Sequence, residues 1–172
     1  MADPTAGALL TFNFNEASVL IVDENAGFMD VTTLVLSSFG FKKLHRCQSL
    51  GESHAFSQDV EADLILVDPF PRADEGLALI RDLRKRQQPA DPPRVVIVVT
   101  GHTPRDLIQQ ARAVGADYVV AKPFSPTTLL DRILWSAAPL AERGRGGENP
   151  GAAGVQPQAV DPLREAARAL LQ

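Results

Sequence analysis

Four short apolar runs, separated by amphipathic segments, set the pattern of this 172-residue chain. The runs are mostly β-branched and cover residues 19–22, 64–67, 95–99 and 118–121. Runs of this length and composition are typical of strands that a parallel sheet buries on both faces. A weaker and more polar run at 43–47 fits a fifth strand at the edge of the sheet.

Helical patterns fill the intervals between these runs. Apolar residues recur at helical spacing over 28–39, 77–86, 104–114 and 127–138, and a poorly patterned short helix is expected at 50–60. This alternation predicts an α/β fold: a five-stranded parallel sheet, doubly wound, with helices on both faces. In such folds the ligand site lies at the carboxyl ends of the strands.

Composition excludes several classes of protein. Seventeen Lys and Arg residues against 21 Asp and Glu residues give a net charge of −4, so the overall charge does not indicate nucleic-acid binding. No apolar run approaches the ~18 residues of a membrane span. The only cysteine, Cys47, excludes an internal disulfide framework. Because the N-terminus also lacks the pattern of a signal peptide, we expect a cytoplasmic protein.

Changes of composition along the chain predict its domains. Residues 18–138 carry the strand and helix pattern and form the expected compact domain, whereas residues 1–17 are expected to be a flexible arm. Residues 139–160 are rich in Gly, Pro and Ala and are typical of a flexible linker. Residues 161–172 place leucines and alanines on one stripe, which predicts a short amphipathic C-terminal helix that docks on the domain or on a partner.

Polar residues follow four of the expected strands. Asp23 and Glu24 follow the first run, Asp68 the second, Thr100 the third and Lys122 the last. In a parallel sheet these ends lie side by side, so a cluster of acids with a hydroxyl and an ammonium should form there. Such oxygen ligands suit Mg²⁺. A carboxylate beside a divalent ion can attack phosphorus and form an acyl phosphate.

These motifs, in this order, resemble the receiver domain of bacterial two-component response regulators. The resemblance covers about residues 18–138 and rests on VLIVDEN, ADLILVD, VVIVVTG and GADYVVAKPF. Gly76, eight residues past Asp68, belongs to the same set. The resemblance implies a flavodoxin-like fold and a cis peptide bond before Pro123.

The resemblance also implies a role for each polar residue at the strand ends. Asp68 would accept the phosphoryl group, Thr100 would be the switch hydroxyl, and Lys122 would contact the phosphate. Asp23, Glu24 and Asp68 would hold Mg²⁺ as the cofactor. These roles follow from the match to the family.

Three positions depart from the family's pattern. Glu24 stands where a second Asp is usual, and its extra methylene is expected to weaken Mg²⁺ binding. Pro71 lies one place earlier than the usual proline of this loop. The family's switch aromatic would be at 119, where this chain has Val119, and strand alternation should turn the neighbouring Tyr118 to the opposite face.

The resemblance implies a single-domain response regulator. A histidine kinase or a histidine phosphotransfer protein would phosphorylate Asp68, and the signal would pass to a downstream effector protein through altered affinity or through a phosphorylation-dependent dimer. Because the domain would catalyse transfer only to its own aspartate, we do not expect an enzyme in the usual sense. The 34 residues after Ala138 are too few for a usual DNA-binding effector, so no DNA binding is expected, and no membrane binding either.

Three alternatives to this function stay open. A degenerate receiver could act as a phosphorylation-independent interaction module. The domain could instead shuttle phosphate as an intermediate in a phosphorelay. Arg143 and Arg145 in the linker could bind a cyclic dinucleotide, which is the least favoured of the three.

Overall fold

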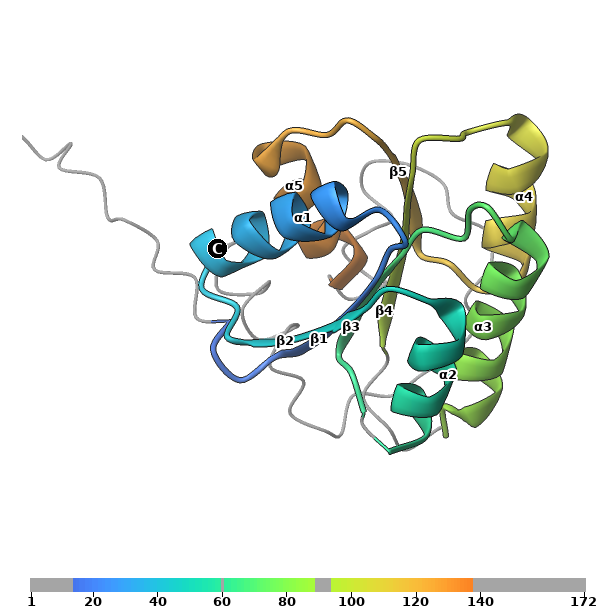
Figure 1. Cartoon of the computed structure of the whole chain (residues 1–172), viewed down its shortest axis with the longest axis horizontal. Coiled ribbons are helices and arrows are strands. Elements are labelled where there is room, and N and C mark those ends of the chain that lie inside the picture. Colours follow the sequence, from blue (N-terminus) through green and yellow to red (C-terminus); the bar gives the residue numbers. More distant parts are fainter. Residues whose placement is uncertain (1–13, 60, 89–93, 138–172) are drawn as a thin grey trace, which may run out of the picture.

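The computed structural model describes residues 14–59, 61–88 and 94–137 (Figure 1). Strands and helices alternate through these ranges. They are β1 (Ser18–Val22), α1 (Ala26–Ser38), β2 (Lys43–Cys47), α2 (Leu50–Asp59), β3 (Leu64–Val67), α3 (Ala73–Arg86), β4 (Val95–Thr100), α4 (Arg105–Ala113), β5 (Tyr118–Ala121) and α5 (Pro126–Ala137). The predicted linker at 139–160 and helix at 161–172 lie outside the described residues, as do residues 1–13 of the predicted arm.

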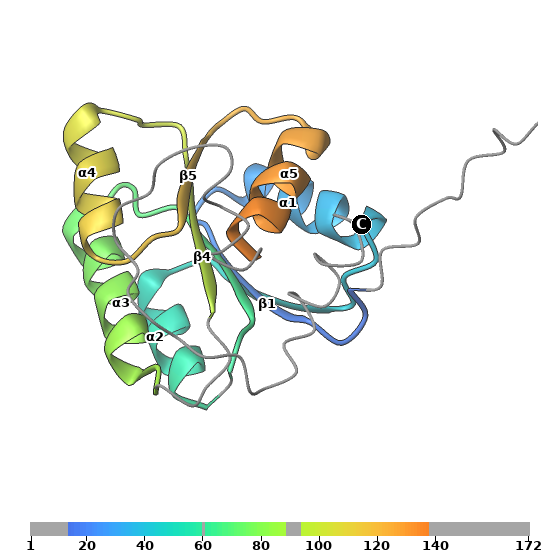
Figure 2. The same ribbon diagram turned by 180° about the vertical axis from the view of Figure 1, so that it is seen from behind.

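The five strands form one parallel sheet in the order β2-β1-β3-β4-β5. Helices α1 and α5 cover one face, and α2, α3 and α4 cover the other, as Figure 1 and Figure 2 show from opposite sides. The expected doubly wound α/β fold is therefore confirmed. Strand order reverses beside β1, so the carboxyl ends of β1 and β3 meet at the place where ligands bind in such sheets.

Side-chain alternation along the strands builds two hydrophobic cores. Val19 and Ile21 of β1 pack under α1 and α5, whereas Leu20 and Val22 pack under α2, α3 and α4. The same division runs through the other central strands, because neighbouring side chains of a strand point to opposite faces. Four of the five strands are mostly apolar for this reason, since both of their faces are covered.

Three helix ends show how local sequence sets the boundaries. The side chain of Asn25 caps α1 by accepting a hydrogen bond from the amide of Phe28 at 3.1 Å. Gly40 follows α1 with a φ of 97°, which confirms it as the predicted stop. Helix α3 begins at Ala73, earlier than its apolar pattern indicates, and the acids Asp74 and Glu75 occupy its first turn.

Phe14 is fully buried and stacks on Phe41 with ring centroids 4.3 Å apart, so the packed domain already includes residue 14.

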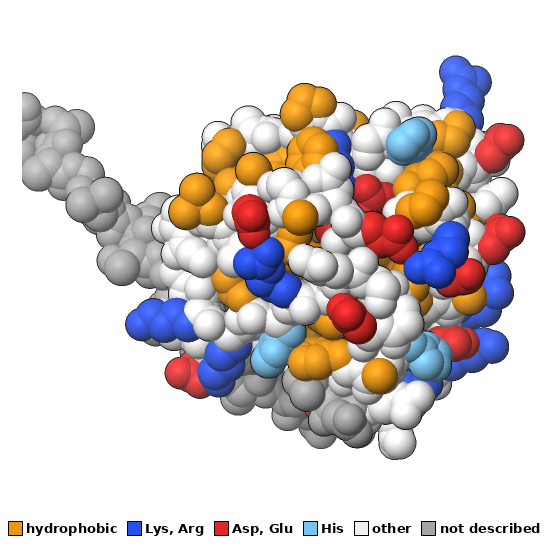
Figure 3. Space-filling view, in the orientation of Figure 1, with side chains coloured by type: hydrophobic (Ala, Val, Ile, Leu, Met, Phe, Trp, Pro, Cys, Tyr) orange, Lys and Arg blue, Asp and Glu red, His pale blue; other side chains and the backbone are white. Residues whose placement is uncertain are grey.

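Val31 and Leu34 expose apolar side chains on α1, and hydrophobic atoms interrupt the polar surface on that side (Figure 3). None of the helices in the described ranges has the length and apolar content that a membrane span requires.

Candidate functional site

Asp23, Asp68 and Lys122 converge at the carboxyl ends of β1, β3 and β5. The ammonium of Lys122 donates to Asp23 Oδ2 at 2.5 Å and to Asp68 Oδ2 at 2.8 Å. The three residues occur just past the ends of their strands, where sheet hydrogen bonds continue: the amide of Asp68 donates to Val22 and that of Lys122 to Thr100. The backbone therefore fixes the place of each functional side chain.

Each carboxylate is also held by its own loop. Asp23 Oδ1 accepts a hydrogen bond from the amide of Asn25 at 2.9 Å, and Asp68 Oδ1 accepts one from the amide of Phe70 at 3.0 Å. The side chains of Asp23, Asp68 and Lys122 are only 8%, 11% and 4% exposed. Two carboxylates and one ammonium thus leave an excess negative charge in a largely buried site, an arrangement that favours a further cation.

Lys122 has a second contact that fixes its ammonium. Its Nζ lies 4.4 Å from the centroid of the Phe28 ring, in cation–π geometry.

The Lys122–Pro123 bond is cis, as the resemblance implied, and so is the Phe70–Pro71 bond. Asp23 and Asp68 also line a small hollow, together with Thr32 of α1 and Val99 of β4.

Thr100 ends β4 at the same edge of the sheet. Its side chain is fully buried, and its hydroxyl accepts a hydrogen bond from the amide of His102 at 3.2 Å. The His102 ring stacks on the Phe70 ring, with centroids 4.3 Å apart and an angle of 26° between the planes. This stack links the loop after Asp68 to the loop after Thr100, and the sequence pattern gave no signal of it.

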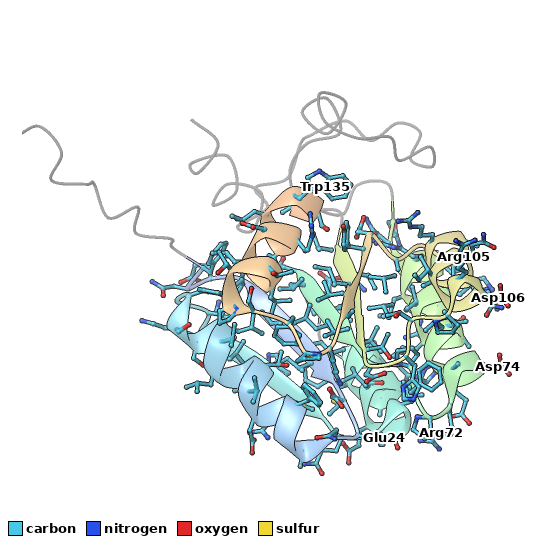
Figure 4. All side chains as sticks on the ribbon, turned by 90° about the horizontal axis from the view of Figure 1, so that it is seen from above. Glu24, Arg72, Asp74, Arg105, Asp106 and Trp135 are labelled. Atoms are coloured by element: carbon cyan, nitrogen blue, oxygen red, sulfur yellow. The ribbon has the colours of Figure 1, made fainter. Side chains whose placement is uncertain are left out.

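Glu24, the third acid to which the resemblance gave a metal-binding role, does not join Asp23 and Asp68. Its Oε1 lies 2.8 Å from Arg72 Nη2, and Figure 4 shows the two side chains beside each other at the rim. Within the described ranges, no group of three or more acids, histidines or cysteines is arranged to hold a metal. The carboxylates that the structure brings together are those of Asp23 and Asp68.

Tyr118 points away from the α4 side of the sheet. It packs against the core under α1 and α5, where its ring and the Trp135 ring lie edge to face with centroids 5.7 Å apart. The Arg132 guanidinium lies 4.7 Å from the centroid of the Tyr118 ring. The neighbouring Val119 packs on the opposite face. The orientation expected from strand alternation is therefore confirmed for both residues.

Comparison with known proteins agrees with this fold. The family model of the response regulator receiver domain matches residues 19–134. The chain belongs to this family. It is thus a receiver domain of the kind found in two-component systems, and receiver domains are signalling domains.

Relatives that match the receiver domain include proteins longer than this chain. The phosphate regulon transcriptional regulatory protein PhoB of Pseudomonas aeruginosa is 30% identical over 116 residues, which are 67% of this chain and 49% of that protein. The transcriptional regulatory protein GltR of the same organism is 30% identical over 122 residues, or 69% of this chain and 48% of that protein. The chain therefore spans about half the length of the curated relatives it matches.

Solved structures of receiver proteins superpose on about two thirds or more of the chain. A CheY-like receiver domain protein from Methanospirillum hungatei has 26% identity and a TM-score of 0.63, over 77% of this chain and all of that one (100%). A response regulator from Burkholderia pseudomallei has 26% identity and a TM-score of 0.60, over 68% of this chain and 66% of that one. The latter structure contains a phosphorylated aspartic acid, a calcium ion and citrate.

Proposed function

We propose that this receiver domain accepts a phosphoryl group on Asp68 and acts as a single-domain response regulator. The observation that carries the proposal is the convergence of the Asp23 and Asp68 carboxylates on the Lys122 ammonium. The donor would be a histidine kinase or a histidine phosphotransfer protein. The phosphorylated aspartate in the Burkholderia pseudomallei relative supports the assignment.

The residues at this edge fit Mg²⁺ as the cofactor. Mg²⁺ in proteins takes one or two carboxylates and keeps several waters, and Asp23 and Asp68 supply two carboxylates that reach the same point. When bound, the ion would supply positive charge that offsets the repulsion between a carboxylate and an incoming phosphoryl group. The role of Glu24 as a further ligand stays a prediction.

The transfer itself needs little from the protein beyond placement and charge. A carboxylate oxygen of Asp68 would form a bond to phosphorus while the phosphorus–nitrogen bond of the donor phosphohistidine breaks, and the departing nitrogen would keep the electron pair. The amide of Phe70 holds Asp68 in one orientation during this step. Lys122 would donate to the phosphoryl oxygens, and the Thr100 hydroxyl, already bound by the His102 amide, would use its own hydrogen in the same way.

The signal would leave the domain through changed contacts with an effector protein. A phosphoryl group adds negative charge and acceptor oxygens beside Thr100 and Lys122, and both residues connect to loops that lead into α4 and α5. The effector surface would then include α4, β5 and α5. Because Tyr118 is packed against α5, the coupling would run through Thr100 and its loop and not through a tyrosine on the α4 side.

Intact-protein mass after incubation with acetyl phosphate tests the proposal. We expect a Mg²⁺-dependent gain of one phosphoryl group, absent in Asp68→Ala. The matched control is Asp74→Asn, which removes an exposed carboxylate from the first turn of α3 and should leave the gain intact.

A chain that uses only a kinase as its donor would not react with acetyl phosphate. We therefore expect beryllofluoride with Mg²⁺ to shift the amide signals around Thr100 and Lys122 in the same protein. If the mass does not increase and the amide signals do not shift, phosphorylation is contradicted and the interaction module remains as the proposed function. Rapid transfer of the phosphoryl group onward to a histidine phosphotransfer protein would instead favour the phosphorelay shuttle.

A further inference from the structure

Arg72 binds two acids at the rim of the site. Its Nη2 lies 2.8 Å from Glu24 Oε1, across 48 residues of sequence, and its Nε lies 3.5 Å from Oε2 of Glu75 in the first turn of α3. The guanidinium therefore bridges the loop after β1 and the start of α3. Its side chain is 48% exposed and that of Glu24 is 36% exposed, so the pair lies in contact with solvent.

The backbone places Arg72 where it can reach Glu24. Arg72 precedes α3, and its carbonyl accepts the amide hydrogen bond of Gly76 at 3.0 Å. Gly76 in turn lies against Pro69, next to Asp68, so the first turn of α3 sits close to the loop that follows the phosphorylation site. The position of the guanidinium is thus tied to the position of Asp68.

We infer that Arg72 sets the cation preference of the site by holding the Glu24 carboxylate outside it. Glu24 follows Asp23 directly in the sequence, yet its carboxylate is engaged by Arg72 while that of Asp23 faces Asp68 across the Lys122 ammonium. The site is then limited to two carboxylates as long as Arg72 keeps this partner. This inference rests on the proposed Mg²⁺ site.

Two carboxylates and three carboxylates suit different ions. Mg²⁺ keeps most of its waters and takes one or two carboxylates, whereas Ca²⁺ takes six to eight oxygen ligands in a flexible arrangement. Release of Glu24 would therefore improve Ca²⁺ binding more than Mg²⁺ binding. Because an exposed ion pair contributes at most about 1 kcal/mol, the effect of releasing it corresponds to about a two- to fivefold change in affinity.

The test is direct titration of the full chain with Mg²⁺ and with Ca²⁺. The NMR signals of the Asn25 and Phe70 amides are recorded at each step of the titration. These amides donate to Asp23 and Asp68, so they report on the site without any phosphoryl donor. We expect Arg72→Gln to tighten Ca²⁺ about two- to fivefold and Mg²⁺ by less. Arg72→Lys, which keeps the charge but not the forked donor, should fall between Arg72→Gln and the unchanged protein.

A double-mutant cycle separates release of Glu24 from simple loss of a positive charge. In a Glu24→Gln background the Ca²⁺ gain from Arg72→Gln should disappear, and Glu24→Gln alone should change neither affinity more than about twofold. Arg105→Gln is the matched control, because it removes one cation at the start of α4 without touching Glu24. It should leave the ratio of Ca²⁺ to Mg²⁺ affinity unchanged.

Three results would overturn the inference while leaving the proposed function intact. They are an unchanged affinity ratio in Arg72→Gln, the same gain in both backgrounds of the cycle, and a strong loss of Mg²⁺ binding in Glu24→Gln alone. If the unchanged protein binds no divalent ion, or still binds one after both Asp23→Asn and Asp68→Asn, the proposed Mg²⁺ site fails and this inference fails with it.

Discussion

Gly76 lies so close to Pro69 that no side chain fits between them. A Cβ placed on Gly76 would be 2.4 Å from the Cβ of Pro69 and 2.6 Å from its Cα. Pro69 follows Asp68 directly, so this contact holds the first turn of α3 against the loop that orients the Asp68 carboxylate. The glycine is required here by close approach of two backbone segments.

Gly76→Ala should therefore destabilise the domain, although alanine is normally the better helix residue. An ordinary exposed helix position gains about 1 kcal/mol from this change. Here the clash involves the backbone and ring of proline, and overpacking of this kind costs about 1–3 kcal/mol. Thermal unfolding should show a melting temperature several degrees lower.

Gly51→Ala in α2 is the control for this prediction. The nearest atom to its new Cβ would be the Ser49 hydroxyl at 3.9 Å, which is an ordinary contact. Its melting temperature should stay the same or rise. Equal behaviour of Gly76→Ala and Gly51→Ala would show that the Pro69 contact is not needed.

Arg84→Lys should lower stability because one guanidinium joins three parts of the fold. Arg84 donates to the carbonyls of Gly115 and Arg94 at 2.8 and 2.7 Å, to Gln87 at 3.1 Å, and to Asp117 at 2.7 Å. An ammonium cannot reproduce this forked pattern. The expected loss in chemical denaturation is about 2–4 kcal/mol, because several partly buried acceptors lose their donor.

Arg86→Lys provides the comparison, since Arg86 is exposed two residues further along the same helix. Its free energy of unfolding should change by no more than about 0.5 kcal/mol. If Arg84→Lys is equally mild, the lysine must satisfy the same acceptors, and the guanidinium geometry is not essential.

The strands could be predicted from the sequence because burial on both faces of a sheet leaves a local apolar pattern. Apolar runs of β-branched residues predicted β1, β3, β4 and β5, and the more polar Lys43–Cys47 was correctly placed at an edge as β2. Parallel pairing then places the carboxyl ends of the strands at the same edge of the sheet, independently of the paths of the loops. This is why the strand pattern alone is enough to group Asp23, Asp68 and Lys122.

The rim of the site could not be predicted in the same way. The contact of Glu24 with Arg72 joins exposed side chains 48 residues apart, and neither strand pattern nor helix periodicity governs such a pair. The Phe70–His102 stack likewise depends on the paths of two loops. Tyr118 was predictable because its direction follows from strand alternation alone.

Cys47 should be a poorly reactive thiol in the folded protein. It is 5% exposed at the end of β2, and burial, with a further effect of Glu52, raises the pKa of its thiol. The thiol is neutral in both states below its unfolded pKa of about 8.5, and above that pH the unfolded chain ionises more readily. Stability should therefore fall as the pH rises above about 8.5.

Labelling with a thiol reagent at about pH 8 measures the reactivity of Cys47. We expect slow labelling of the native protein and fast labelling in denaturant. Denaturation curves on either side of pH 8.5 measure the pH dependence of stability. Cys47→Ala should remove the thiol's contribution to the pH dependence. Fast labelling of the native state would contradict the burial of the thiol.

His102→Ala should shorten the lifetime of a phosphoryl group on Asp68. The His102 ring stacks on the Phe70 ring, and the amide of Phe70 donates to the Asp68 carboxylate. We expect this stack to hold the two loops together and so to limit the access of water to a phosphorylated Asp68. An aromatic pair contributes about 0.5–1.5 kcal/mol; if the stack must open to admit the attacking water, its loss should make dephosphorylation about two- to tenfold faster. His102→Phe keeps the stack and should keep the lifetime of the phosphoryl group.

His45→Ala is the control. It removes a comparable contact with Phe56, at 4.6 Å between ring centroids on the β2 side, and should leave the lifetime unchanged. Loss of phosphate from the isolated phosphoprotein, followed by intact mass, gives the rates. Equal rates for His102→Ala and the unchanged protein would show that the stack does not control access of water.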